Sequence, residues 1–340
     1  MLAGALLAAV SVAAAEPPVK TPIRGLVSMG AYRFVARGGD PVNTLEPLNA
    51  KPGIFGGIVV IATWKQLQET ATSGLADNNA IDRALADVRE YNRRNPAKPL
   101  AVKLRVWAGF EAPDWAKNLG AGPITVTRDG HDRVLGHFWG PPYRKAWSRF
   151  QELLAARYDQ EPLIHEVAVT SCMSFTAEPF VIPGEEPALG VLRAAGLKDE
   201  PYRQCLAHAV DDYAPWKTTL VEFPLNPFRA TDTRPWKSDH AFTEQVMRSC
   251  RASLGKRCIF DNHNLDANPP ENILPIYEAM RRLGPPVEFQ TYRETPGDFE
   301  GTIRKGLSLG ASSIELWQDF RGFPLLPDET LRRWASMLEE

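Results

Sequence analysis

The stretch that decides the fold runs over residues 57–106, GIVVIATWKQLQETATSGLADNNAIDRALADVREYNRRNPAKPLAVKLRV. It starts with a strand-like run rich in β-branched residues (57–63) and ends with a second such run (100–106). This order indicates two parallel strands that are joined by a right-handed helical crossover. The helix is predicted from apolar residues at helical spacing between the two runs, Ile81, Leu85 and Val88.

The same alternation extends over most of the chain and gives eight strand-like runs in all. Eight such units without a Gly-rich dinucleotide turn favour the α/β class, as a single closed (β/α)8 TIM barrel rather than an open doubly wound sheet. The stretches 109–141 and 173–200 predict long loops after strands three and four. The other six runs are Arg24–Met29, Glu166–Ser171, Thr218–Phe223, Arg257–Asp261, Val287–Thr291 and Ser312–Trp317.

Length and charge narrow the possibilities further. A chain of 340 residues has room for two ordinary domains or one large barrel, and the count of units favours one barrel over 24–340. A formal net charge of -2 without a long basic run excludes nucleic acid and an anionic membrane surface as expected partners. We expect a monomer.

The first 15 residues, MLAGALLAAVSVAAA, are typical of a secretory signal, and 16–23 then form a linker. Because no Lys or Arg precedes the apolar run, either the start lies upstream or the run is an anchor, although it is shorter than the ~20 residues of a membrane span. The expected location is secreted or periplasmic. There, Cys172 with Cys205 and Cys250 with Cys258 are expected as disulfides, with free buried thiols as the alternative.

The ends of the predicted strands are rich in carboxylates, amides and indoles, which matters because barrel enzymes keep their active sites there. The chain lacks an HExxH pattern and a phosphate-cradling Gly loop. Paired carboxyl groups cleave glycosidic bonds, amides bind hydroxyl groups, and indole faces stack on sugar rings. The expected sugar contacts are Trp64, Trp107, Arg105, Asn262, His263, Gln290 and Trp317.

Several short motifs resemble the clan A glycoside hydrolases, the barrel superfamily that includes β-galactosidases and cellulases. They are ATWKQLQ after the second strand, VKLRVWAGFEAPDW through the third, and AEPF after the fourth. In that clan an Asn-Glu pair follows strand four, so the resemblance implies Glu178 as general acid/base, with Ala177 in place of the Asn. The clan's nucleophile ends strand seven, where this chain has Gln290, with Glu288 two positions earlier.

Three residues are candidates for the second carboxyl group, in the order Glu315, Glu288 and Glu222. Glu315 shares its side of the strand with Trp317, which predicts that it faces the barrel interior. Strands four and eight lie on opposite sides of the barrel, so a Glu178/Glu315 pair favours an inverting separation of about 6.5–9.5 Å over a retaining one near 5–5.5 Å. Alternatively, Glu315 is a structural partner of Lys103 or Arg105, and Glu178 caps a helix.

Three functions remain open at this point. The first is a glycoside hydrolase that acts on an oligo- or polysaccharide without a metal or other cofactor. The second is a catalytically silent carbohydrate-binding barrel, which the residues at 177 and 290 favour. The third is a metal-dependent barrel hydrolase that uses Asp261, His263 and Glu222. A metal site requires these three side chains to converge within ligand distance.

Overall fold

The computed structural model describes residues 18–29, 33–34, 41–42, 45–128, 130–231, 237–292, 297–317 and 326–339. Eight parallel strands form a closed barrel in the order β1-β14-β13-β12-β9-β8-β5-β4, so the TIM-barrel prediction is confirmed. The strands are β1 (Gly25–Ser28), β4 (Gly57–Thr63), β5 (Ala101–Trp107), β8 (Ile164–Ala168), β9 (Leu220–Pro224), β12 (Cys258–Leu265), β13 (Val287–Thr291) and β14 (Ala311–Leu316).

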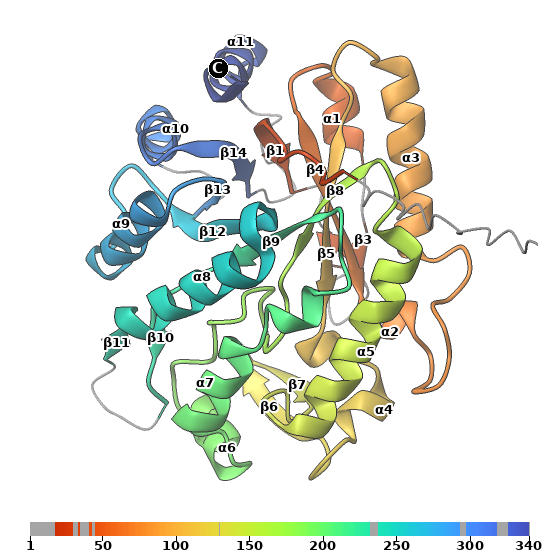
Figure 1. The fold of residues 1–340 in the computed structure, drawn as a ribbon, viewed down its shortest axis with the longest axis vertical. Helices are drawn as coiled ribbons and strands as arrows, with labels where there is room; N and C mark the ends of the chain where they lie inside the picture. The colour runs from red at the N-terminus through yellow and green to blue at the C-terminus, as the bar shows by residue number, and fades with distance from the viewer. Residues whose placement is uncertain are drawn as a thin grey trace, which may run out of the picture.

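Helices surround the barrel, and Figure 1 shows them outside the strands. The longer ones bury one apolar face against the sheet, as α3 does with Ile81, Leu85 and Val88. Their bounds are α1 (Glu46–Ala50), α2 (Trp64–Leu67), α3 (Ala80–Arg94), α4 (Asp114–Lys117), α5 (Pro141–Tyr158), α6 (Ala188–Ala194), α7 (Asp199–Ala207), α8 (His240–Leu254), α9 (Leu274–Leu283), α10 (Phe299–Ser308) and α11 (Asp328–Glu339).

Three small antiparallel pairs lie outside the barrel: β2 (Arg33–Phe34) with β3 (Pro41–Val42), β6 (Ile124–Arg128) with β7 (His131–Leu135), and β10 (Phe228–Arg229) with β11 (Ser238–Asp239). The β6–β7 hairpin and α4 occupy the predicted loop after β5, and α6 lies in the predicted loop after β8. The β6–β7 hairpin, α6 and α7 lie at the end of the molecule toward which β5 points. This end is in the lower part of Figure 1. We call this end, where the strands have their carboxyl ends, the mouth.

Lys20 closes the opposite end of the barrel. Its Nζ donates hydrogen bonds to the carbonyl oxygens of Asp159, Glu161 and Ile164 at 2.6, 2.9 and 2.7 Å. It also donates to Thr219 Oγ1 at 2.9 Å. These acceptors precede or begin β8 and β9, so the segment before β1 is fastened across the amino ends of the strands.

Both predicted disulfides are present, Cys172–Cys205 and Cys250–Cys258. Among the described helices, none combines the length and apolar character that a membrane crossing needs. The predicted signal, Met1–Ala15, lies outside the described residues, and the domain boundaries at 15 and 23 remain predictions.

Candidate active site

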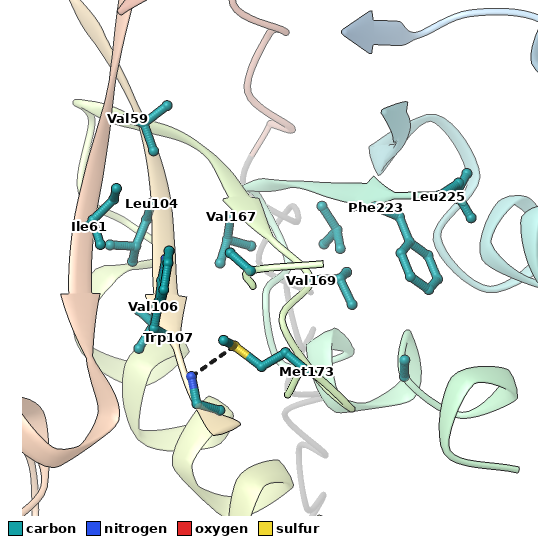
Figure 2. Packing of buried hydrophobic residues seen from close by; sticks show 14 of the residues in the cluster. Val59, Ile61, Leu104, Val106, Trp107, Val167, Val169, Met173, Phe223 and Leu225 are labelled. Atoms are coloured by element: carbon teal, nitrogen blue, oxygen red, sulfur yellow. Dashed lines mark hydrogen bonds between the residues drawn. The ribbon is translucent and has the colours of Figure 1, made fainter. Parts of the chain in front are cut away.

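The barrel interior is apolar on one side and charged on the other. Paired residues of parallel strands face the same side, and Val59 and Ile61 of β4 pair with Lys103 and Arg105 of β5. Figure 2 shows the two β4 side chains beside β5, and the Ala108 amide that donates to Met173 Sδ just beyond the end of β5. Five other strands each bring a buried carboxyl group: Glu166, Glu222, Asp261, Glu288 and Glu315.

Lys103 holds the layer nearest the closed end. Its Nζ lies 2.7 Å from Glu288 Oε2 and 3.6 Å from Glu166 Oε2. Burial opposes the charge of Lys103, but the surrounding carboxylates, Glu288 first, hold its pKa well above the usual value. Burial and the Glu288 carboxylate raise the pKa of Glu166 far above its usual value. Glu288 is thus fully buried in an ion pair, and not open to the mouth.

Arg105 holds the next layer toward the mouth. Its Nη1 and Nη2 donate to the two oxygens of Glu315 at 2.9 and 2.8 Å, a bidentate pair. Gln290 Oε1 lies 3.5 Å from Nη1. Arg105 and Glu315 are each 1% exposed. The contacts of Glu315 match the ion-pair alternative considered above, and Arg105 is engaged by the protein rather than open to a sugar.

Glu222, Asp261 and His263 converge where the neighbouring strands β9 and β12 face the interior. His263 Nε2 lies 2.8 Å from Asp261 Oδ2 and 3.7 Å from Glu222 Oε1. One ligand-type atom from each residue lies within 4.8 Å of the other two. β12 continues to Leu265, four residues beyond the predicted strand, and therefore His263 is an inward-facing strand residue.

Glu178 lies above this cluster, in the loop that follows β8. Asn226 Nδ2 donates to its Oε2 at 2.7 Å, and its Oε1 lies 3.6 Å from His263 Nδ1. Asn264 Nδ2 in turn donates to Asn226 Oδ1 at 2.7 Å. The Glu178 side chain is 18% exposed, in contrast to the five carboxyl groups below it. Glu178 does not cap a helix among the described residues, because its oxygens face Asn226 and His263.

The charges of this group are strongly coupled. Burial raises the pKa of Asp261 to about 7, and the Glu222 carboxylate adds to the rise. Burial works against a charged His263, but Asp261 and Glu178 outweigh it and hold the pKa of His263 well above its usual value. Burial would likewise raise the pKa of Glu178, yet His263 and Asn226 bring it below the usual value. Without a ligand, Glu178 is therefore a carboxylate beside an imidazolium.

The three predicted sugar platforms lie in different environments. Trp317 follows β14 and is 38% exposed, and Trp107 ends β5 and is 7% exposed. Trp64 is 0% exposed and lies under α5, where its ring contacts Trp147 and Phe150 at 5.1 and 5.3 Å. The Thr63 capping box starts α2 at Trp64 and turns the indole into the helix layer. The prediction that Trp64 binds sugar is wrong.

The amides at the mouth also differ from expectation. Asn262 is fully buried, and its Nδ2 donates to the carbonyl oxygen of Leu225 at 2.7 Å. The same Nδ2 lies 3.5 Å from Asn226 Oδ1, so Asn262 supports Asn226, and its role toward hydroxyl groups stays a prediction. The sequence places Asn226 and Asn264 at strand ends but assigns them no role. Their contacts with Glu178 depend on the extension of β12, which no local pattern indicates.

A hollow of about 350 Å³ opens beside the mouth. Tyr292, which directly follows β13, is 39% exposed there. The other lining residues come from the loops after β12 and β13: Asp266, Asn268, Pro270, Gly297 and Asp298. This hollow and the exposed Trp317 give the mouth two aromatic surfaces on the β13–β14 side.

The chain matches no family model and no curated protein sequence. Solved structures do match. Endo-glycoceramidase II from Rhodococcus sp., in a cellobiose-like imidazole complex, aligns with a TM-score of 0.55 at 14% identity, over 92% of this chain and 79% of that one. The fold is similar to that of this barrel. A β-1,4-D-mannanase from Cryptopygus antarcticus aligns with a TM-score of 0.50 at 12% identity, over 93% and 90% of the two chains.

These likenesses confirm the predicted resemblance at the level of the fold. At 12% to 14% identity they do not assign an activity to any side chain of this barrel. The roles of Glu178, Glu315 and the other candidate residues must therefore be argued from the geometry of the mouth.

Proposed function

We propose that this chain is a glycoside hydrolase and that Glu178 is its acid/base carboxyl group. The observation that carries the proposal is the position of this carboxylate. It lies at the mouth of a barrel shared with glycoside hydrolases, is partly exposed, and is fixed by Asn226 at 2.7 Å. The resemblance implied an Asn directly before Glu178 that this chain lacks, and Asn226 brings an amide to the same carboxylate from the end of β9.

In this proposal Glu315 is the second carboxyl group. The Arg105 fork fixes the orientation of both its oxygens, and each oxygen keeps a further lone pair for another contact. Gln290 pairs with Glu315 across β13 and β14 and shares Arg105 Nη1 with it, and Trp317 follows β14 toward the mouth. A substrate that reaches Glu315 would therefore also meet the neighbouring Gln290 amide, which could bind a hydroxyl group.

The substrate is proposed to be an oligo- or polysaccharide held by indole and phenol faces. Trp317 and Tyr292 are the exposed aromatic side chains at the rim, and stacking on sugar CH faces is their natural use. An acid role for Glu178 further requires that the substrate separate it from His263, because the imidazolium lowers the pKa of Glu178. Secretion to an oxidising compartment is part of the same proposal, supported by the two disulfides.

The test measures hydrolysis on a panel of aryl glycosides and polysaccharides by wild type, Glu178→Gln and Glu315→Gln. We expect each substitution to lower kcat by at least ~100-fold, the usual contribution of a positioned acid or base. Glu166→Gln is the matched control. It changes an equally buried glutamate near the closed end and should retain activity.

The outcomes separate the alternatives. Full activity of Glu178→Gln contradicts the proposal. If Glu315→Gln is fully active while Glu178→Gln loses activity, Glu315 is only a structural partner of Arg105. Binding of a glycan without hydrolysis of any panel member by wild type would instead establish the carbohydrate-binding barrel, and substitution of Trp317 should then weaken the binding.

A further inference from the structure

The cluster of Glu222, Asp261 and His263 is unusual in its hydrogen bonding. All three side chains are at most 5% exposed. In the described structure, none of the oxygens of Glu222 and Asp261 makes a hydrogen bond of acceptable geometry, and neither does Nε2 of His263, although this nitrogen lies 2.8 Å from Asp261 Oδ2. Buried polar atoms are costly in this state. One ligand-type atom from each residue lies within 4.8 Å of the other two, so a single ion bound between them would complete the site.

The charge balance of the interior points to a cation. The barrel strands bury five carboxyl groups, and Lys103 and Arg105 are the permanent cations buried with them among the described residues. Lys103 is paired with Glu288 at 2.7 Å and Arg105 with Glu315 at 2.8 Å. Glu222 receives only a distant contact, since Arg105 Nη2 lies 3.9 Å from its Oε1. Glu222 and Asp261, whose oxygens lack hydrogen-bond partners, are thus the carboxyl groups without a close permanent cation.

We propose that Glu222, Asp261 and His263 bind a divalent transition-metal ion of the zinc class. One imidazole nitrogen and two carboxylate oxygens are typical zinc ligands. The distances of 2.8 and 3.7 Å from His263 Nε2 to the two carboxylates bracket the ~3.4 Å between neighbouring ligands of a tetrahedral zinc ion. The imidazole disfavours Mg²⁺ and Ca²⁺, which prefer oxygen ligands.

The surroundings of His263 fit this assignment. Its other ring nitrogen, Nδ1, faces Glu178 Oε1 at 3.6 Å. A metal-bound histidine usually directs its second nitrogen to a carboxylate, which fixes the tautomer and the ring orientation. A metal on Nε2 would place the Nδ1 proton toward Glu178. The metal would thus fix the His263 ring, and the ring would in turn orient the Glu178 carboxyl group at the mouth. The metal itself would lie buried below Glu178.

Zinc binding is measured directly, and its test does not depend on the proposed glycosidase activity. The full chain, prepared without a polyhistidine tag and stripped with a chelator, is titrated with Zn²⁺ in a calorimeter. We expect one Zn²⁺ per chain and no competition from Mg²⁺. Co²⁺ in place of Zn²⁺ should give visible absorption bands of a site with nitrogen and oxygen ligands.

Variants locate the ion. Glu222→Gln and Asp261→Asn should weaken Zn²⁺ binding by more than ~100-fold, beyond the ~10–100-fold that loss of an outer partner costs. Glu178→Gln should retain the stoichiometry with affinity reduced within that smaller range. His208→Ala is the control, because it removes a surface imidazole that lies 2.9 Å from Asp211 and should leave binding unchanged.

A wild-type protein that binds no Zn²⁺, or that binds it as well after substitution of Glu222 and Asp261, overturns the proposal. If the Glu222 or Asp261 variant does not fold, the Co²⁺ spectrum of the wild type and the Zn²⁺ affinity of Glu178→Gln still test the proposal. A wild-type protein without Co²⁺ absorption bands contradicts the metal site. Loss of activity in Glu178→Gln without any zinc binding would support the glycosidase and reject the metal.

Discussion

Side chains of the same type have different roles in this barrel, and their exposure to solvent distinguishes these roles. Trp64 and Trp317 both follow a strand end, yet one is fully enclosed and the other 38% exposed. The carboxyl groups divide in the same way. Glu315 is clamped by Arg105, whereas Glu178 is held by one amide and reaches the mouth. Side-chain environment, rather than residue type, decides which of them meets a substrate.

Truncation of Trp64 tests this division. Trp64→Ala should destabilise the protein by about 3–5 kcal/mol, because it leaves a cavity among packed rings. The KM of the variant that remains folded should equal that of wild type. Urea unfolding and steady-state kinetics measure the two effects. Trp317→Ala should do the reverse, with a raised KM and stability within about 0.5 kcal/mol of wild type. A raised KM in Trp64→Ala alone would restore it as a sugar contact.

At the scale of elements, local signals set where helices begin. Asn79 caps α3, because its Oδ1 accepts hydrogen bonds from the amides of Ile81 and Asp82 at 2.9 and 3.3 Å. Its Nδ2 also donates to Tyr158 Oη at 2.9 Å, so the cap joins α3 to the end of α5. One residue therefore supports two neighbouring helices of the outer layer.

Asn79→Ala should cost about 1–2 kcal/mol of stability, from the lost cap and the lost contact with Tyr158. Asn79→Ser keeps an acceptor for the cap and should recover part of this loss. Thermal or urea unfolding of the two variants against wild type measures the difference. Equal stability of the alanine and serine variants would show that the link to Tyr158, and not the cap, carries the effect.

The sequence predicted elements better than it predicted contacts. All eight strands were predicted from short runs rich in β-branched and other apolar residues, because the outward face of each barrel strand packs against the helix layer even where the inward face is charged. The end of β12 was missed, since DNHN reads as a polar loop, and the strand continues there only because its neighbours supply the pairing. Glu178, Asn226 and His263 come from three different strand ends. Their proximity is set by barrel closure, which leaves no trace in local spacing.

For the molecule as a whole, two disulfides tie segments outside the barrel strands to the body. Cys172–Cys205 spans 33 residues, from the loop after β8 to α7, and Cys250–Cys258 spans 8 residues between α8 and β12. In the chain-entropy account a longer closed loop restricts the unfolded chain more. The Cys172–Cys205 bond also fixes the loop after β8, which carries Glu178.

Opening Cys172–Cys205 by a double substitution to serine should therefore cost about 4 kcal/mol, and opening Cys250–Cys258 about 2–3 kcal/mol. Unfolding free energies of the two double variants provide the measurement. A larger loss from the shorter loop would mean that native packing around Cys250 and Cys258, rather than chain entropy, dominates.

The contacts of Lys20 determine from which end of the barrel the protein can be attached to a surface. Residues 18–23 leave the barrel at the amino ends of the strands, where Lys20 Nζ binds the chain before β8 and Thr219, which directly precedes β9. Glu178 and Trp317 face the other way. A molecule attached to a bead, a cell envelope or a fusion partner through this segment would turn its open end outward, so tethering from that side should leave long polymers free to reach the mouth.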